Sequence, residues 1–223
     1  MGIIQTLATL TIAPLARIPF QEVGGSYLAE ASANTIDKFI NHFTNHTQTI
    51  CEALVRANDR AWDCLELALA DESWISSLKH RLNAKEKQAV AEQFRSFLPE
   101  IAGKNELRGK ILDELRSARK TGVLDGTRLD STNLPEELRS FLASTDFQQM
   151  KSRSDNQLRL ISEELKQLGY INLALIAGQK TEDCSLLVNA TRYFFRREVE
   201  KNPQLFRSIT YSQLDSLDQS QQA

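Results

Sequence analysis

The chain has 223 residues, of which 41% are hydrophobic and 25% are charged, and its net charge is −2. This composition is typical of a folded globular protein and excludes the disordered and membrane-embedded classes. The slightly acidic balance gives no general attraction to nucleic acid or anionic lipid, so nucleic acid is not an expected partner. The three cysteines have no Cys-x-x-Cys spacing, which argues against a disulfide framework or zinc module and fits a reducing cytoplasm.

The N-terminal stretch is the most apolar part of the sequence, and with the hinge Gly24-Gly25 it makes an arm over residues 1–25. Pro14 and Pro19 interrupt it, so a transmembrane span is not predicted. One interpretation is a buried helix or arm that covers the rest of the fold. The other is a segment that is released on activation and inserts into a membrane. The side chains that would enter the bilayer are Ile3, Ile4, Leu7, Leu10, Ile12 and Leu15.

The next stretch, from Ser26 to Leu98, contains neither glycine nor proline. Its apolar residues repeat at three- and four-residue steps, which predicts one long helix from about Tyr27 to Ala70, with a break near Asn45 or Asn58-Asp59 as an alternative. The repeat predicts a buried seam, with Asp37, Lys38, Glu52 and Asp63 outside it. The seam comprises Ile36, Ile40, Phe43, Ile50, Leu54, Leu65 and Ala68.

The remaining elements are predicted as shorter helices. Helices over 74–82, 83–98 and 106–120 complete a long-helix bundle of residues 26–122, and the turn signal Asp125-Gly126 places a linker over 123–134. A C-terminal helical group over 135–217 contains helices at 135–143, 147–168, 170–176, 184–201 and 203–217, before a disordered tail, 218–223. In the helix over 147–168, Met150, Leu158, Ile161, Leu165 and Leu168 share one face. Residues 170–176 are predicted as a buried helix, although their apolar run could also form a strand. The predicted fold is all-α, an elongated helical bundle built round one long N-terminal helix.

Catalytic, cofactor and metal signatures are not found in the sequence. It contains no P-loop, no Gly-x-Ser-x-Gly elbow and no Gly-x-Gly-x-x-Gly loop. His42 and His46 share a helix face, but no further ligand is spaced to complete a metal shell. We therefore expect neither an enzyme nor a bound cofactor or metal.

Two groups of basic residues stand out against the acidic average. Each is interpreted either as a solvated helix face or as a patch for a partner, anionic lipid or phosphate. The first group is Lys104, Arg108, Lys110, Arg116, Arg119 and Lys120; the second is Arg192, Arg196, Arg197, Lys201 and Arg207, interleaved with Tyr193, Phe194, Phe195 and Phe206. We predict Arg192, Arg196 and Arg197 as partner-binding residues and expect Trp62 and Phe195 to pack.

Two segments carry a resemblance to a known kind of module. Residues 57–62, ANDRAW, with the following LELALADESW, and residues 192–198, RYFFRRE, with the following VEKNPQLF, resemble an uncharacterised helical module at the N-termini of large bacterial proteins with repeats or effector and signalling domains. The resemblance implies a non-enzymatic interaction or oligomerisation module of bacterial signalling or defence, in the cytoplasm, that binds a protein partner or its own copy.

The order of an apolar N-terminus before a long helix is also similar to the plan of membrane-perturbing four-helix domains of cell-death effectors. This similarity implies the alternative function, a membrane-permeabilising effector that associates with the membrane on activation.

Overall fold

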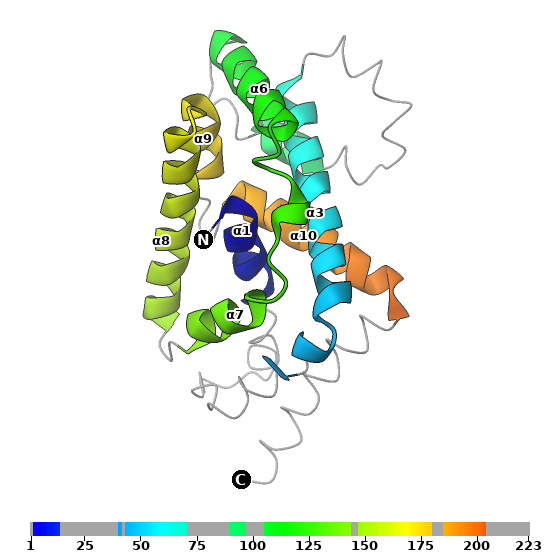
Figure 1. Ribbon diagram of the computed structural model, residues 1–223. Coiled ribbons are helices and arrows are strands. Elements are labelled where there is room, and N and C mark those ends of the chain that lie inside the picture. The colour runs from blue at the N-terminus through cyan, green and yellow to red at the C-terminus, as the bar shows by residue number, and fades with distance from the viewer. Residues whose placement is uncertain are drawn as a thin grey trace.

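The computed structural model describes residues 2–13, 40–41, 43–70, 90–96, 105–143, 147–179 and 185–203 (Figure 1). Within these ranges the chain forms helices and turns and no β-strand, so the predicted all-α class is confirmed. Residues 90–96 are helical, as predicted. The hinge Gly24-Gly25, the helix predicted over 74–82, nearly all of the one over 203–217 and the tail lie outside the described residues.

The first helix, α1 (Ile3–Ile12), lies in the centre of the fold. It contacts α3 (Thr47–Leu69), α7 (Leu134–Leu142), α8 (Phe147–Gln167) and α10 (Leu186–Lys201) (Figure 1). All 10 of its residues are buried, as expected for a helix that carries no charge on any face. The part of the N-terminal arm that the structure describes is thus a core helix, and does not merely cover the core.

Of the long helix predicted from Tyr27 to Ala70, the structure describes residues 40–41 and 43–70. Helix α3 begins at Thr47, because His46 leaves the helical region with φ −123° and ψ 17°, and it ends at Leu69. Residues 43–45 are helical on the other side of this break. The alternative with a break near Asn45 is therefore confirmed, whereas α3 passes through Asn58-Asp59 without interruption.

The predicted seam is buried wherever the structure describes it. Ile40, Phe43, Ile50, Leu54, Leu65 and Ala68 are at most 3% exposed. Glu52 points outward, while Asp63 is half-buried because it pairs with Arg119 at 2.8 Å. Ile36, Asp37 and Lys38 lie outside the described residues.

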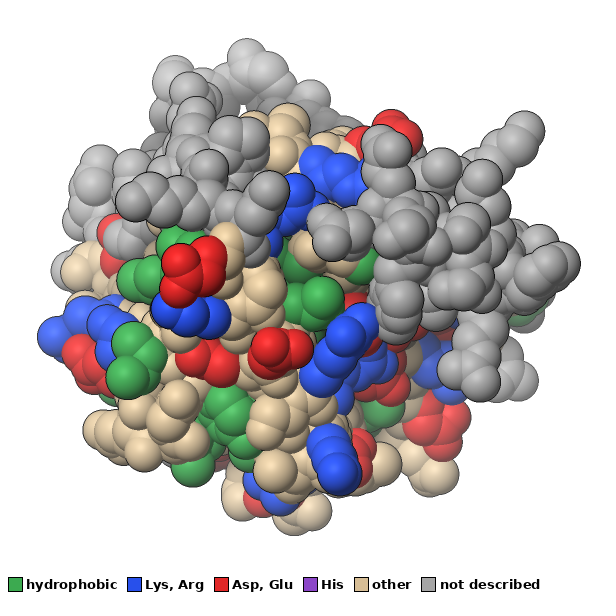
Figure 2. Space-filling model, turned by 90° about the horizontal axis from the view of Figure 1, so that it is seen from above, with side chains coloured by type: hydrophobic (Ala, Val, Ile, Leu, Met, Phe, Trp, Pro, Cys, Tyr) green, Lys and Arg blue, Asp and Glu red, His purple; other side chains and the backbone are tan. Residues whose placement is uncertain are grey.

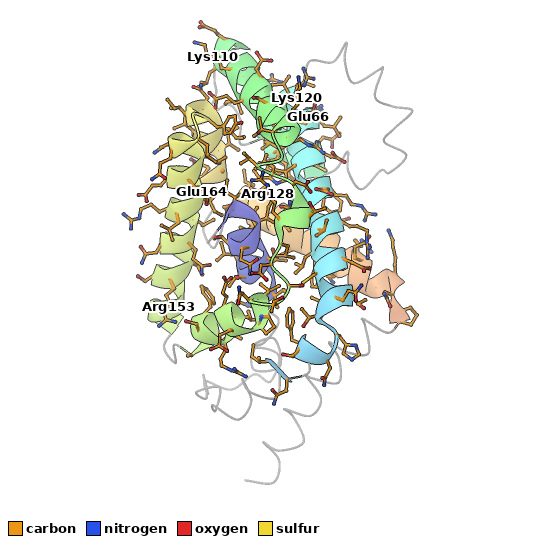
Figure 3. All side chains as sticks on the ribbon, in the orientation of Figure 1. Glu66, Lys110, Lys120, Arg128, Arg153 and Glu164 are labelled. Atoms are coloured by element: carbon orange, nitrogen blue, oxygen red, sulfur yellow. The ribbon has the colours of Figure 1, made fainter. Side chains whose placement is uncertain are left out.

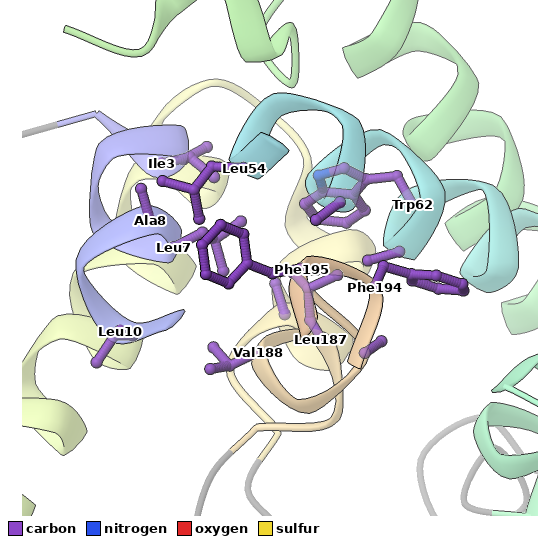
Figure 4. Packing of buried hydrophobic residues seen from close by; sticks show 14 of the residues in the cluster. Ile3, Leu7, Ala8, Leu10, Leu54, Trp62, Leu187, Val188, Phe194 and Phe195 are labelled. Carbon is purple, nitrogen blue, oxygen red and sulfur yellow. The ribbon is translucent and has the colours of Figure 1, made fainter. Parts of the chain in front are cut away.

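Helix α10 packs across α3 and is bonded to it through a buried carboxylate (Figure 1). Glu198, whose side chain is 10% exposed, accepts from Arg56 Nε at 2.7 Å and from Arg60 Nη1 at 2.6 Å. Burial alone would raise the pKa of Glu198, but the hydrogen bond from Arg56 and the charge of Arg60 outweigh it and hold that pKa below its ordinary value. Phe195 of α10 faces Leu7 and Leu54, and Trp62 lies beside Phe194 (Figure 4). Trp62 and Phe195 are 1% and 2% exposed, which confirms their predicted packing role.

The segment predicted as a linker, 123–134, packs against the helices on both sides of it. It follows α6 (Asn105–Lys120), and Gly122, just beyond the end of that helix, has φ +74°. The segment contains the short 3-10 helix η3 (Gly126–Arg128). The Gln5 side chain of α1 donates to the Asp130 carbonyl at 3.2 Å and accepts from the Asp130 backbone N–H at 2.9 Å. The hydrophobic core is one cluster that includes residues from both sides of this segment.

Helices α8 and α9 (Ile171–Ala177) form an antiparallel hairpin. Gly169, with φ +89°, makes the turn between them, a conformation that glycine adopts without steric cost. The helix predicted for residues 170–176 is confirmed, and the strand alternative is wrong. On α8, Leu158, Ile161 and Leu165 are buried as predicted. Leu168 was predicted on the same buried face but is 49% exposed, because it follows the last turn of α8.

Candidate functional site

Of the three arginines predicted to bind a partner, Arg192 is engaged inside the fold. Its Nε and Nη2 donate to the backbone carbonyl of Leu10 at 3.2 and 2.7 Å. Leu10 lies in the last turn of α1, where a helix leaves carbonyls without an intrahelical partner. The half-buried guanidinium thus caps α1, a role that the sequence could not indicate because the two residues lie at opposite ends of the chain.

Arg196 and Arg197 lie on the outer face of α10. Arg196 Nε and Arg197 Nη1 donate to the carboxylate of Glu200 at 3.2 and 2.9 Å, and the Arg196 side chain is 82% exposed. The hydrogen bond from Arg197 contributes most to lowering the pKa of Glu200. The Arg197 guanidinium also lies over the Tyr193 ring, 5.6 Å from its centroid. This surface therefore offers one net positive charge from two arginines and one glutamate, beside a partly exposed tyrosine.

The other basic group, on α6, holds helices together. Arg108 Nη2 donates to the carbonyls of Ala68 and Leu69 at 3.1 and 3.3 Å, at the C-terminal end of α3. Arg116 and Arg119 bind the two oxygens of Glu66 at 3.0 and 3.1 Å. Glu66 lies on α3 next to α6, whereas Lys110 and Lys120 extend from α6 itself (Figure 3). Basic and acidic side chains are interspersed on the face that Figure 2 shows. Arg116 and Arg119 thus form ion pairs with α3, and Arg108 caps α3. Neither the solvated-face nor the phosphate-patch interpretation describes these arginines.

The residues of the membrane-insertion alternative are mostly in the core. Ile3, Ile4, Leu7, Leu10 and Ile12 are at most 4% exposed. Leu15 lies outside the described residues. In the part of the chain that the structure describes, no helix is both long and apolar enough to span a membrane.

The described thiols and histidine give no reactive centre. Cys51 and Cys64 are buried, and burial is the main cause that raises the pKa of the Cys51 thiol to about 11. A thiol with that pKa is almost entirely protonated near neutral pH and is a poor nucleophile. No group of three potential metal ligands exists among the described residues. His42, His80 and Cys184 are outside them, and His46 precedes the first turn of α3.

An open groove of about 330 Å³ lies between α7 and α8, and Phe141 is its large apolar residue. Arg153, at the α7 end of α8 (Figure 3), lines it and donates to the carbonyl of Ser140 at 2.6 Å. The other lining residues are Glu137, Asn156 and Gln157. The groove holds no paired acid and base, nucleophile or metal shell from which a reaction could be derived.

The most unusual described surface is at the turn between α8 and α9. Leu168, Ile171 and Leu175, here called the hairpin cluster, are 49%, 60% and 44% exposed. Ile171 and Leu175 lie four residues apart on α9 and therefore share a face. The sequence does not reveal this surface, because its apolar run over 170–176 predicts a buried helix.

The hairpin cluster is mounted on a fixed scaffold. The carboxylate of Glu114 on α6 accepts from the backbone N–H of Leu173 at 2.7 Å and from the side chain of Asn172 at 2.6 Å, which caps α9. Ser162 of α8 donates to the carbonyl of Ala174 at 3.0 Å. The exposed leucines and isoleucine are thus presented by a hairpin that is bonded to α6.

The fold and its surfaces define an all-α protein with a closed core, a bonded α8–α9 hairpin that exposes aliphatic side chains, and a small basic surface on α10. Neither a protein-family model, nor a curated protein, nor a solved structure matches the chain.

Proposed function

We propose that the protein is a non-enzymatic helical module that binds another protein chain, its own copy included, and that it acts in the bacterial signalling or defence setting which its resemblance implies. The hairpin cluster is the observation that carries this proposal. Large aliphatic side chains at an exposed, rigid site are typical of surfaces that bind other proteins.

The free energy gained by covering the hairpin cluster is suited to reversible association. Full burial of a Leu or Ile side chain contributes about 1.5–3 kcal/mol, so covering three half-exposed ones contributes about 2–4 kcal/mol. That alone gives weak binding, and neighbouring contacts must add to it. Arg196 and Arg197 on α10 remain proposed partner-binding residues, because their outer face is exposed, but Arg192 is better explained as the cap of α1.

The membrane-permeabilising alternative has less support. Helix α1 would have to leave the centre of the core and expose Ile3, Ile4, Leu7, Leu10 and Ile12 to water. At about 1.5–3 kcal/mol for each buried side chain, this cost is comparable with the whole stability of an ordinary domain, about 5–15 kcal/mol. Its 10 residues would also extend only about 15 Å, half of a bilayer core.

Light scattering over a wide range of protein concentration tests self-association through the hairpin cluster. We expect the average mass to rise with concentration, and the double variant Ile171→Glu/Leu175→Glu to stay monomeric because two charges would be buried in the interface. Leu160→Glu is the matched control, since Leu160 is 47% exposed on α8 but lies on the side of that helix away from Ser162 and α9.

A protein partner other than a second copy gives a different outcome. The wild type then stays monomeric, and a defined protein recovered with it from its native cells is recovered with Leu160→Glu but not with the double variant. A wild type that is monomeric at every concentration and captures the same proteins as the double variant would contradict the proposal.

A further inference from the structure

Helix α9 carries Ile171 and Leu175 of the hairpin cluster and is too short to be stable by itself. It has 7 residues, whereas isolated helices shorter than about 12–15 residues are marginal in water. Its N-cap residue, Tyr170, makes no side-chain hydrogen bond to the first N–H groups of the helix, which have no intrahelical partner either. The helical order of α9 therefore depends on contacts with neighbouring elements.

Glu114 of α6, the helix beside α9 (Figure 1), supplies the cap that Tyr170 does not provide. It uses both carboxylate oxygens: Oε1 accepts from Asn172 Nδ2 at 2.6 Å, and Oε2 accepts from the backbone N–H of Leu173 at 2.7 Å. Hydrogen bonds to an ionised acceptor are about twice as strong as neutral ones, and a negative charge at a helix N-terminus is further stabilised by the helix dipole. Both bonds are partly buried, so water competes with them less than at the open surface.

Two other polar contacts of α9 are placed differently. The hydroxyl of Ser162 on α8 donates to the carbonyl of Ala174 at 3.0 Å, in the middle of α9. The hydroxyls of Thr121 and Tyr170 lie 3.0 Å apart at an exposed position, where water can replace the bond. Glu114 is thus the residue that holds the first turn of α9.

We propose that Glu114 is the positioning residue of the hairpin cluster: it keeps the first turn of α9 helical, so that Ile171 and Leu175 stay on one face and can bind a partner together. This role rests on the proposed protein-binding function. Without the cap, the first turn of α9 opens, and a partner has to order it again before both side chains are covered. The population that is competent to bind then falls, and the apparent affinity falls by the same factor.

Backbone amide exchange measures the order of α9 directly, without any partner. The reporters are the N–H groups of Ala174 and Gly178, which donate to the carbonyls of Tyr170 and Ala174 at 3.0 and 3.1 Å. In Glu114→Gln one carboxylate oxygen is replaced by an NH₂ group, which faces a donor of α9 and cannot accept from it. We expect both reporter amides to exchange about 10- to 100-fold faster, as the loss of a hydrogen bond to a charged group implies, while the amides of α3 keep their rates.

Asn172→Asp supplies a second variant and a rescue. Alone, it brings two carboxylates into contact, whose repulsion also opens the first turn and speeds up exchange. Combined with Glu114→Gln, the new amide donates to the new carboxylate, and the remaining oxygen of residue 114 accepts from the Leu173 N–H, so both bonds form again. We expect this double variant to regain slow exchange. Two independent losses of stability would add instead and make the double variant the worst of the three.

Association is then compared in the same proteins by light scattering and by recovery of a partner. We expect Glu114→Gln to weaken binding by about the factor by which it speeds up exchange, and the double variant to restore it. Asp113→Asn, the same change of charge at the exposed neighbouring residue, should leave both measurements unchanged. Glu66→Gln is the control for stability: it weakens the ion pairs between α6 and α3, so it should lower the melting temperature but not speed up the exchange of the two reporter amides.

Two results overturn the role of Glu114: unchanged exchange of the reporter amides in Glu114→Gln, or faster exchange with undiminished association. A wild type that neither self-associates nor recovers a partner contradicts the proposed function instead, and with it the reason for holding the hairpin cluster in place. The two failures are distinguishable because exchange is measured on the protein alone.

Discussion

Gly126 is required by the space around it and not by its backbone conformation. Its φ is not in the left-handed region, unlike those of Gly122 and Gly169. A Cβ added at Gly126 would lie 2.6 Å from Cγ1 and 3.2 Å from Cα of Val55. The 3-10 turn η3 can therefore pack on α3 only because residue 126 has no side chain.

Gly126→Ala should destabilise the protein by about 1–3 kcal/mol, the usual cost of overpacking, as measured by denaturant unfolding. Val55→Ala should recover part of this loss in the double variant, because it removes the methyl group nearest to the new Cβ. Gly109→Ala is the control: nothing lies within 4 Å of its Cβ position, and alanine in a helix should add about 0.5–1 kcal/mol. Equal effects of the two alanines would show that the contact with Val55 is not tight.

The sequence predicted a turn at Asp125-Gly126, and the structure has one. What the sequence could not show is the partner of that turn, because Val55 lies far away along the chain. The same limit explains Arg192 and Arg108. An arginine in a helical pattern looks the same whether it faces water or caps another helix, and only the three-dimensional packing decides between these roles.

At the scale of elements, the α3–α10 pair depends on the buried Glu198. Its pKa is held below the ordinary value of 4.5, so the stabilisation is fully present above that pH and is lost as the pH falls through the lower, folded-state pKa. We expect Glu198→Gln to cost about 1–3 kcal/mol near neutral pH, less than a fully buried pair because Arg56 is partly exposed. The difference from wild type should shrink below about pH 4.5.

Urea unfolding at several pH values measures this difference. Glu200→Gln is the matched control on the same helix: Glu200 also pairs with two arginines, at 3.2 and 2.9 Å, but on the exposed side, and its loss should change the midpoint far less. A cost of Glu198→Gln that does not change with pH would mean that the carboxylate charge is not what holds α10 to α3.

The elements best predicted from sequence are those with local signals at their ends. The observed bounds of α6 and α7 lie within about one residue of the predicted ones. Thr121-Gly122 marks the end of α6, and Pro135 with the acidic pair Glu136-Glu137 marks the start of α7. The break at His46 has no such mark and was predicted only as an alternative. The predicted burial of Leu168 is wrong, because the apolar spacing in the sequence continues past Gln167, where α8 ends.

At the scale of the whole molecule, the position of α1 is what the sequence left open. Its uncharged and mostly apolar sequence predicts burial, but not whether it covers the core or forms its centre. The contacts that decide this are nonlocal: α1 packs on α7, α8 and α10, and the bonds of Gln5 to Asp130 and of Arg192 to Leu10 each join distant parts of the chain. The hydroxyls of Thr6, Thr9 and Thr11 donate to carbonyls four residues earlier in the chain. These side chains therefore need no hydrogen-bond partner from the surrounding apolar core.

A chain that lacks residues 1–13 should therefore lose its cooperative unfolding transition and its near-ultraviolet circular dichroism. Ile3, Leu7, Leu10 and Ile12 are at most 2% exposed, and at about 1.5–3 kcal/mol each they account for about 6–12 kcal/mol, most of an ordinary domain's stability. A peptide of residues 2–13 added in trans should restore the transition, whereas the same peptide with Leu7→Asp and Leu10→Asp should not. If the shortened chain unfolds at the same temperature as the full one, α1 is a covering arm after all, and the core is complete without it.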